Sequence, residues 1–137
     1  MNRLSAMIKL KLFSILFGIL CLSCDNEHES PVPDFPVSLT IKTSFPGDGE
    51  SRLYAGGYGG VIVYCLSQGN YFAYDACCTH ELNRNSIVEP DGALGICNTC
   101  GSKYIFIEGG YPADGPSRLP LKQYSVSGAG GYIHIWN

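Results

Sequence analysis

Positive charge is scarce in this sequence. Only 9 of its 137 residues are Lys or Arg, against 12 Asp or Glu, and the formal net charge is -3 at pH 7. A protein that binds nucleic acid needs clustered basic residues to neutralise phosphates, whereas the basic residues here are spread thinly along the chain. The composition therefore excludes a nucleic-acid partner.

The sequence also lacks a sustained helical pattern and any apolar run long enough to span a bilayer. Glycine, proline and tyrosine are instead abundant, with 17, 8 and 9 copies. This composition is typical of a β domain with many turns. An activated serine, a pair of catalytic carboxylates and a nucleotide-binding loop are missing as well, so the sequence indicates no enzymatic reaction.

The N-terminus has the features of an export signal. Basic residues precede an apolar run from Leu12 to Leu22, which has the length of a signal-peptide core. The run ends at Ser23-Cys24, which resembles a bacterial lipobox, although Cys21 stands where an aliphatic residue is usual. This resemblance implies a signal peptide over residues 1–23, lipidation of Cys24, and a protein anchored to a bacterial membrane in the cell envelope, facing the periplasm or the surface.

Residues 24–36 are acidic and rich in proline, and we expect them to form a solvated tether. Acyl chains on Cys24 would hold the protein at a membrane without a spanning helix. The folded domain is then predicted over residues 37–137, a length that suits one domain with a modest core.

Alternating and apolar runs predict the strands of this domain. The expected strands are 37–42, a hairpin of 61–66 and 71–76, a second hairpin of 86–88 and 93–96 around Pro90-Asp91-Gly92, and then 103–107, 121–126 and 132–136. The glycine-rich segment 44–60 shows no sustained pattern, so we expect a loop there.

Five cysteines belong to the predicted domain, and an odd number argues against a framework made only of disulfides. If the turn of the first hairpin closes symmetrically, Cys65 lies opposite Phe72. Cys77 is then roughly 15 Å or more away along the strand, too far for a disulfide. We therefore expect Cys65 to be a small buried apolar residue.

Thiol and imidazole groups gather in two short clusters, each at the end of a predicted hairpin. They are Cys77-Cys78-Thr79-His80 and Cys97-Asn98-Thr99-Cys100, with sixteen residues between them. These groups are ligands for zinc and for iron–sulfur clusters, whereas magnesium and calcium prefer oxygen. The sequence thus predicts a metal site built from two loops, and the spacing leaves open whether Cys77 or Cys78 is the first ligand.

The residues around the clusters resemble the Rieske family. Cys78-Thr79-His80 and the run from Cys97 to Tyr104 are similar to the family pattern C-x-H, a spacer, then C-x-x-H-G-S-x-Y. Gly115-Pro116 resembles the proline loop that covers the cluster in that family. The resemblance covers most of residues 60–126 and implies an all-β fold, a small antiparallel sandwich or barrel with two metal-binding loops.

What the resemblance implies about function is one-electron transfer by a [2Fe-2S] cluster, with an unnamed redox protein as the partner. Such a carrier is not an enzyme by itself, although it can be a subunit of an oxidoreductase. By analogy Cys78 and Cys97 bind one iron and His80 binds the second. Ser102 and Tyr104 match positions that hydrogen-bond a bridging sulfide and a cysteine sulfur.

The sequence departs from the family at Cys100, which replaces the second histidine ligand. The implied ligand set is three cysteines and one histidine. A thiolate adds a negative charge that imidazole lacks, so the reduction potential should lie below that of a two-histidine centre, between about +300 and about -400 mV.

Two alternatives remain open at this point. Cys77-x-x-His80 with Cys97-x-x-Cys100 has the spacing of a structural zinc site, and the absence of a twin-arginine signal favours zinc because an unfolded exported chain could acquire it after export. In the other alternative a metal-free Rieske fold carries a disulfide between two of these cysteines in the envelope.

Overall fold

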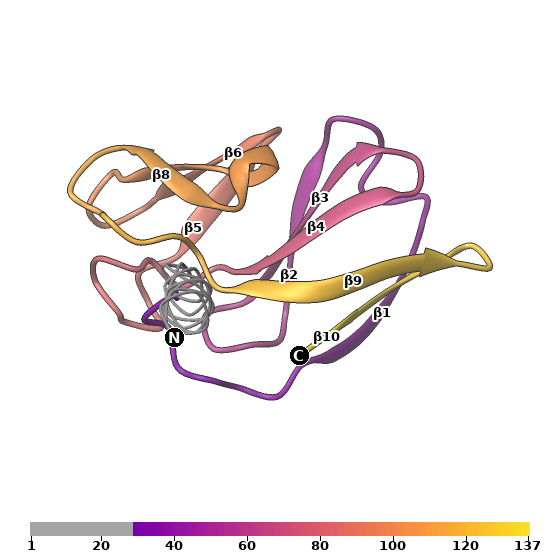
Figure 1. Cartoon of the computed structure of the whole chain (residues 1–137), viewed down its shortest axis with the longest axis horizontal. Helices are drawn as coiled ribbons and strands as arrows, with labels where there is room; N and C mark the ends of the chain where they lie inside the picture. Colours follow the sequence, from indigo (N-terminus) through magenta and orange to yellow (C-terminus); the bar gives the residue numbers. More distant parts are fainter. Residues whose placement is uncertain (1–28) are drawn as a thin grey trace, which may run out of the picture.

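The computed structural model describes residues 29–137, and the expected signal peptide and Cys24 lie outside them. Two antiparallel sheets make up the described part (Figure 1). The six-stranded sheet has the order β1 (Ser38–Lys42), β10 (Tyr132–Trp136), β9 (Gln123–Ala129), β4 (Asn70–Asp75), β3 (Val61–Ser67), β2 (Ser51–Tyr54). The four-stranded sheet has the order β5 (Val88–Asp91), β6 (Leu94–Cys97), β7 (Lys103–Ile105), β8 (Tyr111–Asp114).

The expectation of an all-β antiparallel fold is confirmed. Every strand pair within the two sheets is antiparallel, and the helical structure of residues 29–137 is a single short 3-10 turn, Phe106–Glu108. Within this part of the chain, no helix has the length and apolar character needed to cross a membrane.

The first predicted hairpin is present as β3 and β4, but its register differs from the symmetric closure. Cys65 lies opposite Tyr71, and Ser67 lies opposite Asn70. Leu66 is thus an extra residue on β3, a β-bulge that shifts the pairing by one position. Cys65 is 1% exposed, as expected for a small buried apolar residue.

Two strands lie where the sequence predicts loops. β2 interrupts the glycine-rich segment 44–60 and pairs with β3, while β8 lies in the segment 109–120 and pairs with β7. Both are four-residue edge strands flanked by glycine or proline, so their alternation is too short to detect. In the second hairpin, Pro90 and Asp91 belong to β5, and the turn begins at Gly92, whose φ is 58°.

Part of the segment predicted as a tether lies against the domain. Val32 is 3% exposed, Asp34 forms an ion pair with Lys122, and the carbonyl of Phe35 accepts a hydrogen bond of 3.0 Å from the side chain of Asn137. Packing therefore begins at Val32, six residues before the first strand.

The larger core lies between the two sheets and reaches the cysteines. Tyr74 and Phe106 stack with ring centroids 5.7 Å apart, and Ile62 and Val88 are fully buried around them. Cys78 and Cys97 belong to the same buried cluster. Burial of each large apolar side chain stabilises the fold by about 1.5–3 kcal/mol, so the core also holds the backbone of both cysteine loops in place.

Candidate metal centre

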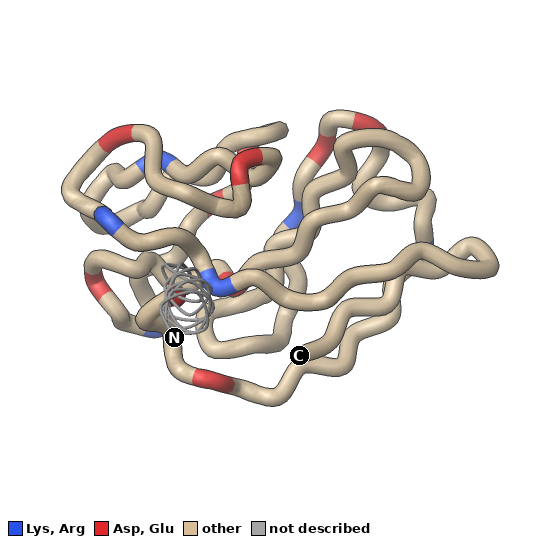
Figure 2. Tube along the Cα trace, viewed as in Figure 1, with Lys and Arg blue, Asp and Glu red and all other residues tan. Residues whose placement is uncertain are grey.

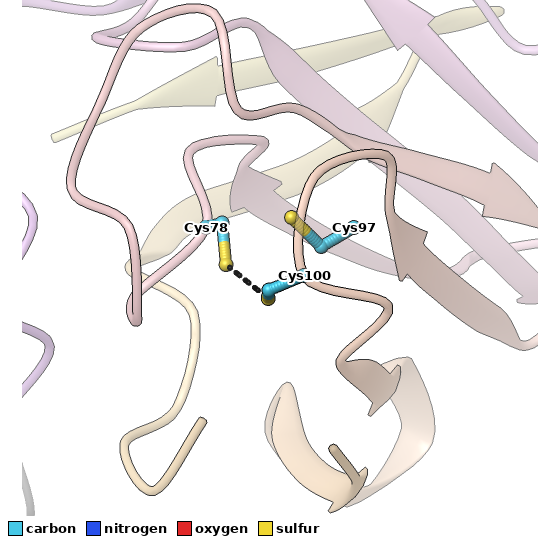
Figure 3. Close-up of side chains that lie close together, drawn as sticks. All are labelled: Cys78, Cys97 and Cys100. Carbon is cyan, nitrogen blue, oxygen red and sulfur yellow. Dashed lines mark hydrogen bonds between the residues drawn. The ribbon is translucent and has the colours of Figure 1, made fainter. Parts of the chain in front are cut away.

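Three thiols from two loops meet at one end of the core. The Sγ atoms of Cys78, Cys97 and Cys100 all lie within 4.8 Å of one another. Figure 3 shows the first approaching from its own loop and the other two from the opposite loop. The Cys78 and Cys100 sulfurs are 3.5 Å apart.

The second loop is a tight turn that follows β6. Cys97 is the last residue of that strand, and its N–H donates to the carbonyl of Ser102 at 2.9 Å. The N–H of Gly101 donates back to the carbonyl of Cys97 at 3.0 Å, and Gly101 has a φ of 72°. Glycine adopts this left-handed conformation without strain, which lets the chain reverse and bring Cys100 beside Cys97.

The first loop follows β4 and is fixed at its base. The N–H of Cys78 donates to the carbonyl of Ser86 at 3.0 Å, and the N–H of Leu82 donates to the carbonyl of Cys78 at 3.0 Å. Leu82 has a φ of 49°, which is uncommon for a residue with a side chain and indicates a conformation held by its surroundings.

A buried carboxylate anchors this loop, and sequence reasoning missed it. Asp75 is fully buried and accepts hydrogen bonds from the N–H groups of Tyr58, Gly59 and Cys77, at 2.6, 2.9 and 2.8 Å. It also accepts one from the hydroxyl of Tyr124 at 2.6 Å. The only sequence signal was an acidic residue at the end of an apolar strand.

Two hydroxyl groups face the sulfurs. The Tyr104 hydroxyl lies 3.4 Å from the Cys78 sulfur, and the Ser102 hydroxyl lies 3.1 Å from the Cys100 sulfur. Ser102 is itself fixed, because its oxygen accepts the N–H of Ser117 at 3.0 Å. A thiolate or a metal-bound sulfur can only accept, so both hydroxyls would donate to it.

The proline loop covers this arrangement closely. A Cβ on Gly115 would lie 2.6 Å from the Cα of Ser102, and the φ of Gly115 is 90°, so only glycine fits there. The Ser117 hydroxyl lies 2.6 Å from the hydroxyl of Thr79 and thereby links the covering loop to the first cysteine loop.

The thiols differ in acidity because their surroundings differ. Burial raises the pKa of Cys97 to about 11, and burial together with Asp75 raises that of Cys77 to about 12. Burial also acts on Cys100, but hydrogen bonds from Ser102 and the neighbouring thiols outweigh it and bring the pKa below the ordinary value. Burial raises the pKa of Tyr104 to about 12, so its hydroxyl keeps its proton at neutral pH.

The remaining candidate ligands lie outside the group of three. The Cys77 thiol is buried and points at the carbonyls of Cys78 and Asn83, at 3.6 and 3.7 Å. His80 is exposed, two residues after Cys78 in the same loop, and its ring is not among the ligand atoms that meet within 4.8 Å. The grouped sulfurs are therefore those of Cys78, Cys97 and Cys100.

The donor chemistry fits the expected metals. Three sulfur ligands, two of them buried, suit iron–sulfur chemistry or zinc, and the two hydroxyls beside the sulfurs suit a centre whose sulfur atoms carry negative charge. A fourth ligand must come from outside the group, and His80 is the imidazole nearest in sequence.

No family model matches the chain, and no curated protein matches it. Solved structures share its fold, among them the three that follow. A chain from the complex of reduced oxygenase and oxidized ferredoxin in carbazole 1,9a-dioxygenase aligns with a TM-score of 0.58 and 24% identity, covering 73% of this chain and 93% of that one. The Sphingomonas yanoikuyae B1 ferredoxin aligns with a TM-score of 0.57 and 24% identity, covering 74% of this chain and 99% of that one. The ferredoxin of carbazole 1,9a-dioxygenase from Nocardioides aromaticivorans IC177 aligns with a TM-score of 0.53 and 17% identity. The alignment covers 74% of this chain and 97% of that one.

These likenesses define the class of fold. The chain has the fold of small ferredoxins of the Rieske-like type, which confirms the fold expected from its two loop motifs. A group of cysteines lies in the two loops of that fold, where the loops meet the core.

Proposed function

We propose that this chain is an electron-transfer protein of the cell envelope, with a Rieske-like [2Fe-2S] centre and a lipid anchor at Cys24. The observation that supports it most is the meeting of three thiols from two loops within 4.8 Å, on a fold shared with ferredoxins. A ferredoxin-like domain needs a sulfur-rich site at the surface of its core, and this is the place where the thiols gather.

Cys78, Cys97 and Cys100 would hold the centre, with His80 as the fourth ligand. When bound, the cluster supplies a site that accepts and releases one electron. The hydroxyls of Ser102 and Tyr104 would donate to sulfur, which stabilises the extra negative charge of the reduced state and raises the potential. Burial of the first two cysteines keeps water away from their sulfurs.

His80 has a distinct part in this proposal. Its side chain is exposed, so it must turn toward the thiols to bind, and it would remain the ligand nearest to solvent. With a single imidazole ligand, any proton that accompanies reduction would be taken up at this one site.

The partner that we propose is another redox protein. One of the similar structures is described as a complex of an oxygenase and a ferredoxin, which supports a protein oxidoreductase as the class of partner. This chain would act as the carrier or as a subunit of such a complex, without a reaction of its own. A lipid on Cys24 would confine it to the surface of one membrane.

A second candidate is a structural module with a zinc ion. For a Zn–S distance of about 2.3 Å, tetrahedral geometry places two sulfur ligands about 3.8 Å apart. Three sulfurs within 4.8 Å, two of them at 3.5 Å, are compatible with ligands of one ion. This candidate predicts a colourless, redox-silent protein that unfolds on chelation.

Metal analysis of matched variants tests the ligand set. We expect the full chain, purified without air exposure in a mild detergent, to contain iron and labile sulfide in equal amounts. Cys78→Ser should lose both, whereas Cys77→Ser should keep both because its thiol points at backbone carbonyls. Zinc in place of iron would refute the electron carrier, and loss of metal from Cys77→Ser alone would refute the assignment of Cys78.

The anchor is tested separately. We expect the N-terminal residue of the mature protein to be a lipid-modified Cys24, which mass spectrometry of the intact chain would detect. Cys24→Ala should release the protein from the membrane fraction and leave its metal content unchanged. An unmodified N-terminus at another residue would refute the anchor but not the metal centre.

A further inference from the structure

Two of the grouped thiols are placed to react with each other. The sulfurs of Cys78 and Cys100 are 3.5 Å apart and belong to different loops. A disulfide has an S–S length of about 2.05 Å, so the two sulfurs would need to approach by about 1.5 Å. Figure 3 marks the contact between Cys78 and Cys100 with a dashed line and marks none to Cys97.

We propose that Cys78 and Cys100 form a reversible disulfide when the site holds no metal, and that this bond competes with metal loading. The proposal concerns the thiols alone and holds for iron–sulfur or zinc. It therefore fails or succeeds independently of the electron-transfer function proposed above.

Accessibility sets the order of the steps. Cys100 is partly exposed, whereas Cys78 is fully buried, so a small disulfide such as glutathione disulfide would meet Cys100 first. The Cys100 sulfur attacks this oxidant, a mixed disulfide forms, and one glutathione thiol leaves with the Cys100 proton. The Cys78 sulfur then attacks the Cys100 sulfur, and the second glutathione thiol leaves with the Cys78 proton.

In the overall reaction, two cysteine thiols are oxidised to one disulfide, and one small disulfide is reduced to two thiols. Two electrons pass from the cysteine pair to the oxidant, and no other reactant is required. The new bond ties the loop after β4 to the turn after β6. It also occupies two of the three sulfur ligands, so metal cannot load until a thiol reductant reopens the bond.

Cys97 is the competing partner for Cys100, because the two lie in a Cys-x-x-Cys sequence. Cys97, however, is only 2% exposed, and its sulfur accepts a hydrogen bond from the N–H of Thr99 at 3.4 Å. The Cys97 sulfur has this contact within its own turn, whereas the Cys78 sulfur lies 3.5 Å from that of Cys100 across the loops. Geometry therefore favours the link between loops over the link within one loop.

Peptide mapping separates these two links. The metal-free full chain would be reduced, freed of reductant, treated with glutathione disulfide and digested with trypsin. Cleavage after Arg52, Arg84 and Lys103 gives peptides 53–84 and 85–103. We expect the disulfide to join these peptides in the wild type and in Cys77→Ser, and expect the joined species to disappear in Cys78→Ser.

Metal uptake gives a second readout. We expect the oxidised chain to bind Zn²⁺ at least tenfold more weakly than the reduced chain, with full recovery after dithiothreitol. Cys97→Ser should still form the joined peptide, which keeps the test informative if Cys78→Ser fails to fold. Two results would overturn the proposal. One is separate peptides with a disulfide inside 85–103, and the other is a chain whose cysteines all remain reduced after the treatment.

Discussion

At the scale of single residues, the hydroxyls of Ser102 and Tyr104 are the groups best placed to influence the proposed centre. The pKa of Tyr104 is raised to about 12, chiefly by burial and also by Cys78, so its proton is available for a hydrogen bond at neutral pH. The Tyr104 ring is fully buried, which holds the hydroxyl in place with little freedom to turn away. This fixed donor should stabilise negative charge on sulfur.

Tyr104→Phe should therefore lower the reduction potential. The ring remains, but its hydroxyl oxygen also accepts the N–H of Thr79 at 3.3 Å, so the variant should keep the fold with a modest loss of stability. If the hydrogen bond is about 1 kcal/mol stronger in the reduced state, the shift is about 40 mV downward, since about 59 mV corresponds to a tenfold change for one electron. A potentiometric titration followed by visible absorption measures it.

Tyr74→Phe is the matched control for this variant. The Tyr74 hydroxyl donates to the carbonyl of Phe106 at 2.6 Å, in the same core but away from the sulfurs. Its loss should cost about 1–3 kcal/mol of stability and leave the potential unchanged. Equal shifts in both variants would contradict a specific role for Tyr104.

Thiol reactivity in the reduced, metal-free chain should follow the pKa order. The lowered pKa of Cys100 means that its thiolate persists to lower pH than that of an ordinary cysteine, while the pKa of Cys77 is raised to about 12. With iodoacetamide at neutral pH, Cys100 should be alkylated first and Cys77 last, since the thiolate is the reactive form. Mass spectrometry of the peptides reads the order, and early modification of Cys77 would contradict it.

At the scale of elements, Asp75 connects the glycine-rich segment to the first cysteine loop. A Cβ on Gly59 would lie 2.7 Å from the backbone nitrogen of Cys77, so the two segments approach as closely as backbone allows. The carboxylate lies at this junction and accepts N–H groups from both. The glycine-rich segment 44–60, expected only to be a loop, therefore supports the first cysteine loop.

Asp75→Asn should destabilise the chain strongly. The amide presents an NH₂ group to a site where every neighbour donates, which leaves buried donors without acceptors. We expect a loss of about 3 kcal/mol in the free energy of unfolding, measured by urea denaturation. Asp91→Asn, at an exposed strand position, is the control and should change little.

The long strands and the cysteine loops could be predicted from sequence, and the rest could not, for physical reasons. Local alternation and turn residues identify β1, β3, β4 and β10. The strands β2 and β8 are only four residues long and depend on partners distant in the chain. Asp75 likewise accepts hydrogen bonds from Gly59, 16 residues earlier in the chain, and from Tyr124, 49 residues later, and no local pattern encodes these relations.

The site was predictable in part for the same reason. The motif names Cys78, Cys97 and Cys100, and their sulfurs meet in the structure. The choice of Cys78 over Cys77 depends on which way each side chain points from the loop, and spacing alone does not determine this. The position of the His80 side chain likewise depends on the conformation of this loop. Its role as a metal ligand remains a prediction.

At the scale of the whole molecule, the segment before β1 packs on the domain instead of leaving it directly. Val32 is buried, and Arg84 lies 5.0 Å from the ring centre of Phe35. Figure 2 shows the basic residues of the described part set apart from one another along the chain. Because the basic residues are not clustered, the ion pairs of this segment are single ones, such as that of Asp34 with Lys122.

Val32→Ala should loosen the segment. Removal of two buried methyl groups should cost about 1–2 kcal/mol of stability. It should also speed hydrogen exchange in residues 30–37 while exchange in the core strands stays slow. Phe35→Ala, at a side chain that is 40% exposed, should have a smaller effect on stability. Unchanged exchange in Val32→Ala would contradict the packing of this segment.

The most direct test of the central claim is the visible absorption spectrum of the full chain, purified without air and recorded before and after reduction with dithionite. An electron carrier with an iron–sulfur centre should be coloured, should bleach on reduction and should recover its bands on reoxidation. A colourless protein with bound zinc and no spectral change on reduction would contradict the claim and identify a structural metal site.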